Sequence, residues 1–314
     1  MILVTPDCYA TIRQTIRSLG EQTVRDRLEI LIVAPSERTL GLIDKELEPF
    51  RAVRVIEFGE IKSLAAARVV GIRSASAPVV ALCEDHAFPE PNWAEALIGA
   101  YRHSAAAVGP AFLNGNPGLM SWISLVMDYG RWMEPVAGGV TDDLAGHSSS
   151  WNRSLLLEYG PALERMMRAP TIMHWDMQAK GHRLYLEPAA KVRHLNVSRF
   201  LSFVLDHFYS AQIFAAARAQ DWRWSYRLAY AVGNVLLMPR TLRGWLRHIR
   251  RARLETELFP KAWPLLLLSL VIWTLGEMVG YGLGMGKAEE RVLGYDARRE
   301  EHLSRRDREL LVAR

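Results

Sequence analysis

The first 83 residues alternate between short apolar runs and segments with helical spacing, and this alternation limits the folds open to the chain. Apolar runs at 2–6, 28–33, 53–57 and 79–83 predict strands. Ile12, Ile16 and Leu19 predict a helix after the first run, and residues 64–76 predict another before the last. Alternation of this length is typical of parallel βαβ units in a sheet covered on both faces. We therefore predict an α/β fold.

The run at 79–83 ends in a polar cluster. Glu84, Asp85 and His86 follow it directly, and a Pro-Glu-Pro turn comes next. Residues i and i+2 of an extended segment point to one side, so we expect Glu84 and His86 to converge while Asp85 faces away or bends back. A carboxylate with an imidazole suits Mn²⁺ better than Mg²⁺. An ordinary turn is the alternative, but ligands of such sheets bind at the carboxyl ends of strands.

Several segments, in the expected order over the first 200 or so residues, resemble the family 2 glycosyltransferases of the GT-A fold. Residues 4–6 and 18–23 resemble the first strand, helix and Gln-Thr turn of that family, and residues 65–72 resemble its A-R-N-x-G-I helix. Residues 84–93 resemble its D-x-D metal motif and P-x-P-x-W tail. The resemblance implies a GT-A domain at 1–199. We predict a mostly helical, membrane-associated region at 200–314 from its composition.

The resemblance continues beyond residue 140. Residues 146–154 are similar to an acceptor-side segment of these enzymes. Asp176, ahead of residues 180–185, resembles the aspartate of the E-D element that serves the family as catalytic base. His194 resembles the histidine that often closes the metal site.

These matches imply roles in an inverting transfer. Such a reaction needs a carboxylate base for the acceptor hydroxyl and a divalent cation that neutralises the departing diphosphate. The resemblance implies that Asp176 is the base and that Mn²⁺ or Mg²⁺ is the cofactor. The implied metal ligands are Glu84, His86 and His194. The implied donor-binding residues are Pro6, Asp7, Arg68 and Asp85, with Arg68 as a fixed positive charge near the phosphates.

Without the resemblance, the same residues have ordinary interpretations. Asp176 fits a helix cap or a solvated charge, and His194 fits a surface histidine. His147 and His174 fit structural or substrate-facing positions without an identifiable partner. The chain also departs from the family pattern at Ser36, where acidic residues usually contact the nucleotide base, at His86, and at Trp175. These departures indicate either a subfamily with altered metal use or a weakened enzyme.

Length and cysteine usage set outer limits. A chain of 314 residues accommodates the expected domain and an appended region. Cys8 and Cys83 lie beside predicted strands without C-x-x-C spacing, which indicates reduced cysteines of a cytosol-facing protein. A cleavable signal peptide is not expected, because the chain enters a strand at Ile2.

Basic and apolar residues concentrate in the C-terminal region. Residues 240–253 hold six arginines and a histidine, interleaved with Leu242, Trp245, Leu246 and Ile249. Such a helix suits an anionic bilayer surface, and nucleic-acid binding ranks lower. The apolar run at 263–284 contains one acid, Glu277. It has the length to cross a bilayer, but a shallow or re-entrant helix and a buried hairpin of a soluble protein remain alternatives.

The sequence therefore predicts an inverting glycosyltransferase that is associated with the cytoplasmic face of a membrane. In a bacterium this would be the inner membrane. Its partners are a nucleotide-sugar donor, a lipid-linked or cell-envelope glycan acceptor and the membrane surface, with no nucleic acid. One alternative is a catalytically silent GT-A domain that acts as a membrane scaffold or binding module. Another is a Rossmann oxidoreductase, but residues 6–9 do not form the G-x-G-x-x-G turn after the first strand.

Overall fold

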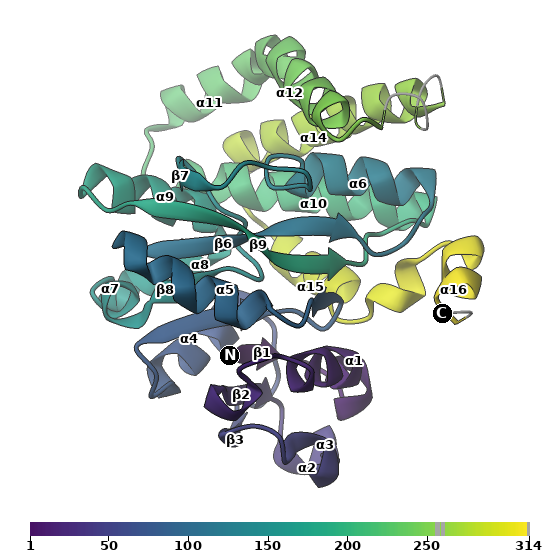
Figure 1. Cartoon of the computed structure of the whole chain (residues 1–314). Coiled ribbons are helices and arrows are strands. Elements are labelled where there is room, and N and C mark those ends of the chain that lie inside the picture. The colour runs from purple at the N-terminus through teal and green to yellow at the C-terminus, as the bar shows by residue number, and fades with distance from the viewer. Residues whose placement is uncertain (255–257, 259–260, 313–314) are drawn as a thin grey trace. The chain divides into compact units, whose positions relative to one another are not determined.

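A computed structural model describes residues 1–254, 258 and 261–312 of the chain (Figure 1). The chain forms two compact units. The first comprises Met1–Leu113 and Val136–His194, and the second comprises Asn114–Pro135 and Leu195–Arg314. The second unit thus takes in a segment from the middle of the chain.

A nine-stranded mixed sheet forms the centre of the first unit, in the order β3-β2-β1-β4-β8-β6-β9-β5, with β7 beside β9. The strands β1 (Ile2–Val4), β2 (Glu29–Ala34), β3 (Ala52–Glu57) and β4 (Val79–Cys83) are mutually parallel. Antiparallel pairs join β4 to β8 (Ser150–Asn152), β8 to β6 (Ala107–Asn114), and β9 (Leu184–His194) to both β5 (Ala87–Pro89) and β7 (Gly139–Thr141). The predicted α/β fold is confirmed, and the first four strands lie close to the apolar runs of the sequence.

The helices of the first unit include the two that the sequence predicted, α1 (Tyr9–Gly20) and α4 (Leu64–Ser74). Ile12, Ile16 and Leu19 are fully buried, as their spacing requires. Ser63 caps α4, because its side chain accepts a hydrogen bond from the Ala66 amide. The other helices are α2 (Glu37–Leu40), α3 (Asp44–Leu47), α5 (Trp93–Ala100), α7 (Arg153–Leu157), α8 (Leu163–Arg168) and α9 (Pro170–Ala179).

Two features of the sheet determine where polar side chains gather. Strand β4 ends at Cys83, so Glu84 to His86 extend beyond its carboxyl end. Strand β5 then pairs with β9, and Ala87 lies opposite His194. This register brings the last residue of β9 next to the residues that follow β4.

The second unit is helical, as predicted. Helix α14 (Ala262–Leu283) packs along α10 (Phe200–Arg218), and α11 (Trp224–Gly233) and α12 (Met238–Arg251) also pack on α14. A Cβ atom at Gly276 or Gly280 would overlap the carbonyl oxygens of Phe208 and Gln212, so α10 and α14 approach closely. The unit also contains α6 (Leu119–Tyr129), α15 (Ala288–Asp296) and α16 (Arg305–Val312).

Among the described residues, two helices are long and apolar enough to cross a membrane, α10 and α14. Half of the most apolar window of α10, and 39% of that of α14, is buried inside the protein. The sequence had indicated only the second of these helices. Because core helices of soluble proteins meet the same criteria, neither helix by itself shows a membrane span.

Gly71 allows α4 to lie directly on the parallel strands. A Cβ atom there would lie 2.6 Å from Ile2 Cγ2 and 3.4 Å from Val33 Cγ2. We expect Gly71→Ala to lower the free energy of unfolding by about 1–3 kcal/mol, since buried side chains of β1 and β2 must shift. Chemical denaturation measures this loss. Gly99→Ala on α5 is the control, because its Cβ meets only the flexible Arg102 side chain. An equal effect of both substitutions would contradict the close packing.

A buried histidine pairs with an exposed carboxylate between two helices of the second unit. His207 on α10 is buried, and its Nε2 lies 3.3 Å from Asp128 Oδ2 on α6. Burial opposes the charged imidazole, but Asp128 and Asp206 outweigh it and raise the pKa of His207 to about 9. The resulting stabilisation is complete below the ordinary pKa near 6.5 and is lost as the pH rises through 9.

We therefore expect wild type and His207→Gln to differ most in melting temperature near pH 6 and to converge toward pH 10. The pH-dependent part amounts to up to about 3 kcal/mol. Thermal unfolding across this range measures it. His248→Gln is the control, because burial and nearby arginines lower the pKa of His248 to about 4, so it stays neutral throughout. A constant difference for His207→Gln would contradict the assignment.

Candidate functional site

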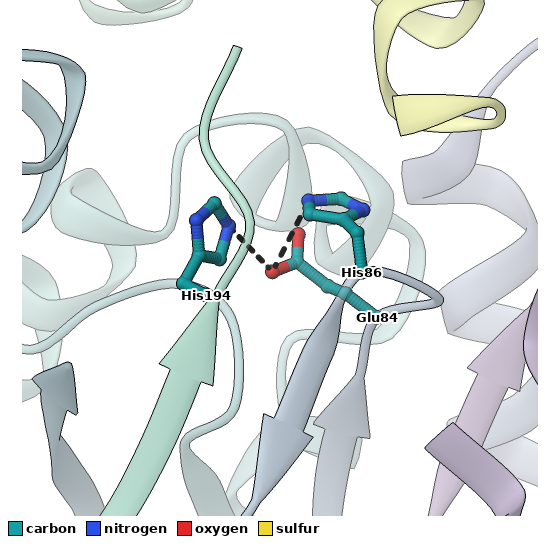
Figure 2. Close-up of side chains that lie close together, drawn as sticks. All are labelled: Glu84, His86 and His194. Atoms are coloured by element: carbon teal, nitrogen blue, oxygen red, sulfur yellow. Dashed lines mark ion pairs between the residues drawn. The ribbon is translucent and has the colours of Figure 1, made fainter. Parts of the chain in front are cut away.

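Three side chains converge at the carboxyl end of β4. Glu84, His86 and His194 are all buried, and one potential ligand atom from each lies within 4.8 Å of the others. Glu84 Oε2 is 3.9 Å from His86 Nε2 and 3.6 Å from His194 Nε2. Figure 2 shows both imidazoles directed toward this carboxylate, one from the loop after β4 and one from the end of β9. The expected convergence of Glu84 and His86 is present.

The two oxygens of Glu84 have different surroundings. Oε1 lies 2.7 Å from His147 Nδ1 and 3.9 Å from Arg68 Nη2. Oε2 is buried and has no hydrogen-bond partner among the described residues. A buried carboxylate oxygen without a partner is costly, and this one faces two imidazole nitrogens. The donor set therefore fits a divalent cation of borderline character, such as Mn²⁺.

Asp85 orients one of the imidazoles. Its Oδ1 lies 2.6 Å from His86 Nδ1, so the side chain bends back onto its neighbour. When Nδ1 donates its proton to Asp85, Nε2 is the ring nitrogen that could bind a metal. Metal-binding histidines are commonly held in this way by a carboxylate on the other ring nitrogen.

The charge of Glu84 is retained despite its burial. Burial alone favours the protonated acid, but the imidazoles of His147 and His86 outweigh it and hold the pKa of Glu84 well below its usual range. At neutral pH the centre of the cluster is therefore an anion.

His147 is a member of this cluster that sequence reasoning did not assign. It contacts Glu84, and its Nδ1 lies 2.9 Å from Arg68 Nη2. Backbone hydrogen bonds from Ser148 N to Leu82 O and from Leu82 N to Ser149 O hold its segment beside β4. The only signal in the sequence was its place in the segment that resembles the acceptor side.

A second buried network secures the same segment. Asp143 Oδ1 lies 2.8 Å from His174 Nδ1, and Trp151 Nε1 donates to His174 Nε2 at 3.2 Å. His174 is fully buried. These contacts tie both ends of residues 143–151 to α9, and they give His174 a structural role.

Asp176 belongs to a different element of the first unit. It is on α9, where Tyr159 donates a hydrogen bond to its Oδ2 at 2.6 Å and Lys180 Nζ lies 2.6 Å from the same oxygen. Burial is the largest single influence on the pKa of Asp176 and raises it, but the contacts with Lys180 and Tyr159 together outweigh burial and lower the pKa. Among the described residues, none of its contacts involves Glu84, His86 or His194.

Pro6 and Asp7 follow the carboxyl end of β1. Because β1 pairs in parallel with β4, with Leu3 opposite Cys83, these two residues lie on the same sheet edge as Glu84. The Asp7 amide donates to Thr5 Oγ1 at 3.2 Å. Both side chains are half-buried. This edge is where ligands of parallel strands bind.

Comparison with family models identifies the family of the N-terminal residues. Residues 1–156 match the family model for glycosyl transferase family 2. No curated protein matched the sequence.

Three solved structures resemble the chain at low identity. GalNAc-T7 with UDP, GalNAc and Mn²⁺ has a TM-score of 0.45 at 14% identity, over 70% of this chain and 50% of that one. Staphylococcus aureus TarS has a TM-score of 0.45 at 12% identity, and the match covers 88% of this chain and 54% of that one. TarS 1–349 in complex with UDP-GlcNAc has a TM-score of 0.44 at 11% identity, and the match covers 89% of this chain and 90% of that one.

The chain spans about half the length of the first two of these structures. The N-terminal half of the chain, residues 1–156, belongs to glycosyl transferase family 2.

Proposed function

We propose that the protein is a metal-dependent, inverting glycosyltransferase that moves a sugar from a nucleoside-diphosphate donor to a lipid-linked or cell-envelope glycan. The observation that supports metal dependence is the buried Oε2 of Glu84, which has no hydrogen-bond partner among the described residues and faces Nε2 of His86 and of His194. A cluster of three buried ligands without C-x-x-C motifs suits a catalytic cation better than a structural one.

On the donor side, Glu84, His86 and His194 would hold the cation, which neutralises charge on the departing diphosphate when bound. Arg68 is buried and close to Glu84 and His147, so it contributes a second positive charge beside the anionic carboxylate. Asp85 keeps His86 in the tautomer that can bind a metal. Pro6 and Asp7 border the nucleotide on the same sheet edge.

On the acceptor side, Asp176 is the proposed base. Its lowered pKa keeps it ionised at neutral pH, and Tyr159 and Lys180 restrain its carboxylate. In the reaction the acceptor hydroxyl gives its proton to the Asp176 carboxylate while the hydroxyl oxygen forms a bond to the anomeric carbon of the donor sugar. The bond from that carbon to the diphosphate oxygen breaks on the opposite face, which inverts the configuration.

The proposed location is the cytoplasmic face of a membrane. What supports it is the arginine-rich segment at 240–253 and the apolar helix α14. A silent GT-A scaffold is the competing proposal, and the altered motif at Glu84 to His86 favours it. One property distinguishes the glycosyltransferase from the silent scaffold. Only the enzyme binds a nucleotide more tightly when a metal is present.

We expect calorimetric titration with a panel of nucleoside diphosphates to show binding of at least one nucleotide that requires Mn²⁺ or Mg²⁺. The double substitution Glu84→Gln/His86→Ala should weaken the metal-dependent affinity for the nucleotide by about 10- to 100-fold or more. Glu90→Gln is the control, because Glu90 pairs with Arg193 in the same unit. Metal-independent binding by wild type would refute the metal role, and no binding at all would favour the scaffold.

We expect Asp176→Asn to lower kcat by about 10²- to 10⁴-fold while the affinity for the donor nucleotide stays unchanged. Product formation from a radiolabelled nucleotide sugar measures the rate. Glu164→Gln is a closely matched control, because Glu164 is also a half-exposed helical acid paired with a base four residues later. Turnover near the wild-type rate in Asp176→Asn would exclude it as the base.

A further inference from the structure

The basic helix α12 does not present its apolar residues to solvent. Trp245 and Ile249 are buried, and Leu242 and Leu246 are partly buried. The opposite side carries Arg240, Arg243, Arg247 and Arg250, which are exposed and lie at spacings of three and four residues, so that they share one helix face. The sequence had suggested that apolar and basic residues of this helix would meet a bilayer together. In the structure, the helix offers a face of arginines alone.

Charge around this face is uniform in sign. Residues 222–254 contain eight arginines and neither aspartate nor glutamate. Arg251 is used internally, because its guanidinium donates to the carbonyl oxygens of Gly130 and Met133. The exposed arginines of α12 make no ion pair with another described residue. A concentrated positive face of this kind suits an anionic surface.

Large apolar side chains are exposed on the neighbouring elements. Helix α11 exposes Trp224, Leu228 and Val232 at intervals of four residues, and Leu236, in the 3₁₀ turn η4 (Asn234–Leu237) that joins α11 to α12, is 82% exposed. Helix α14 exposes Trp263, Leu267, Val271 and Leu275 at the same intervals. Rows of large exposed apolar side chains on adjacent elements are typical of an interaction site.

Helix α11 is held firmly by its other face. Trp222 and Tyr230 pack with Tyr281 of α14, with ring centroids 4.6–5.8 Å apart. Arg218 lies over the rings of Trp222 and Tyr230, and its Nη1 donates to the Tyr281 hydroxyl. The exposed apolar side chains of α11 are therefore fixed in position, and their exposure does not result from a loose helix.

We propose that α11, η4 and α14 lie in the plane of an anionic membrane leaflet, with their apolar side chains among the acyl chains and the arginines of α12 on the lipid phosphates. This inference rests on the proposed membrane location and specifies its geometry. Charge complementarity identifies the occupant, because an apolar protein partner or a second copy of this chain would not need the adjoining arginine face.

The packing of α14 argues against a crossing helix. Gly276 and Gly280 fit against the backbone of α10, and Asn234 of η4 donates to Glu277 Oε2 at 2.5 Å. A span would have to separate α14 from these partners, or carry α10 with its buried Asp206 and Arg299 pair into hydrocarbon. Docking in the plane keeps every one of these contacts.

Flotation of the full chain with phosphatidylcholine vesicles, with and without phosphatidylglycerol, tests the proposal. We expect binding that requires the anionic lipid, weakens at high salt and is released by alkaline carbonate. Neutralising Arg240, Arg243, Arg247 and Arg250 to Gln should weaken binding by about a thousandfold. Leu228→Ser/Val232→Ser/Leu236→Ser should weaken it by more than about tenfold. Neutralising the exposed Arg25, Arg27, Arg306 and Arg308 to Gln is the control and should have little effect.

Several results would overturn the proposal. The wild-type protein would fail to bind vesicles, the control variant would lose as much binding as the α12 variant, or the bound protein would resist release by carbonate. A dimer in light scattering that the Leu228→Ser/Val232→Ser/Leu236→Ser substitution dissociates would also contradict the proposal. Metal-dependent nucleotide binding, measured on the same proteins, separates this inference from the proposed function. If nucleotide binding is normal and vesicle binding is absent, the membrane-docking proposal is wrong and the proposed glycosyltransferase function is unaffected. If nucleotide binding is absent and vesicle binding behaves as expected, docking is supported and the transferase assignment fails.

Discussion

The divided environment of the Glu84 carboxylate is the interaction on which the candidate site depends. One oxygen is held by His147, with Arg68 nearby, and the other faces His86 and His194 without a hydrogen bond. A fully buried anion is unfavourable unless neighbouring groups compensate it. The imidazoles and the guanidinium supply that compensation from four parts of the chain. The positions of α4, β4, β9 and the segment before β8 are thus linked through a single side chain.

The second unit follows a different principle, in which small residues allow helices to approach. Gly276 and Gly280 bring α14 against α10, and the contact of the buried His207 with the exposed Asp128 then links α10 to α6. The apolar side chains that remain exposed on α11 and α14 are those that this packing cannot reach. The unit therefore combines a firm interior with an apolar exterior, which is unusual for a surface that faces only water.

Local patterns in the sequence were sufficient where the structure depends on neighbours along the chain. The strands and helices of the first 83 residues follow from periodicity, and the convergence of Glu84 with His86 follows from the i, i+2 geometry of an extended segment. His194 required the family resemblance, because β9 reaches β5 only through a long-range register. His147 was missed because its contact with Glu84 depends on backbone pairing between β4 and a distant loop. The amphipathic pattern of α12 was recognised, but periodicity does not reveal whether an apolar face meets protein or lipid, and Trp245 and Ile249 meet protein.

The path of the chain has a practical consequence for dissecting the protein. The backbone passes from one unit to the other three times, because Asn114–Pro135 belongs with the C-terminal residues. Helix α6 in that segment buries Ile123, Leu125 and Val126 within the second unit. Cutting the chain near residue 199 would leave this helix without its packing partners and expose those side chains to water. A catalytic fragment that folds by itself therefore needs residues 114–135 replaced by a short linker, in addition to loss of the C-terminal region.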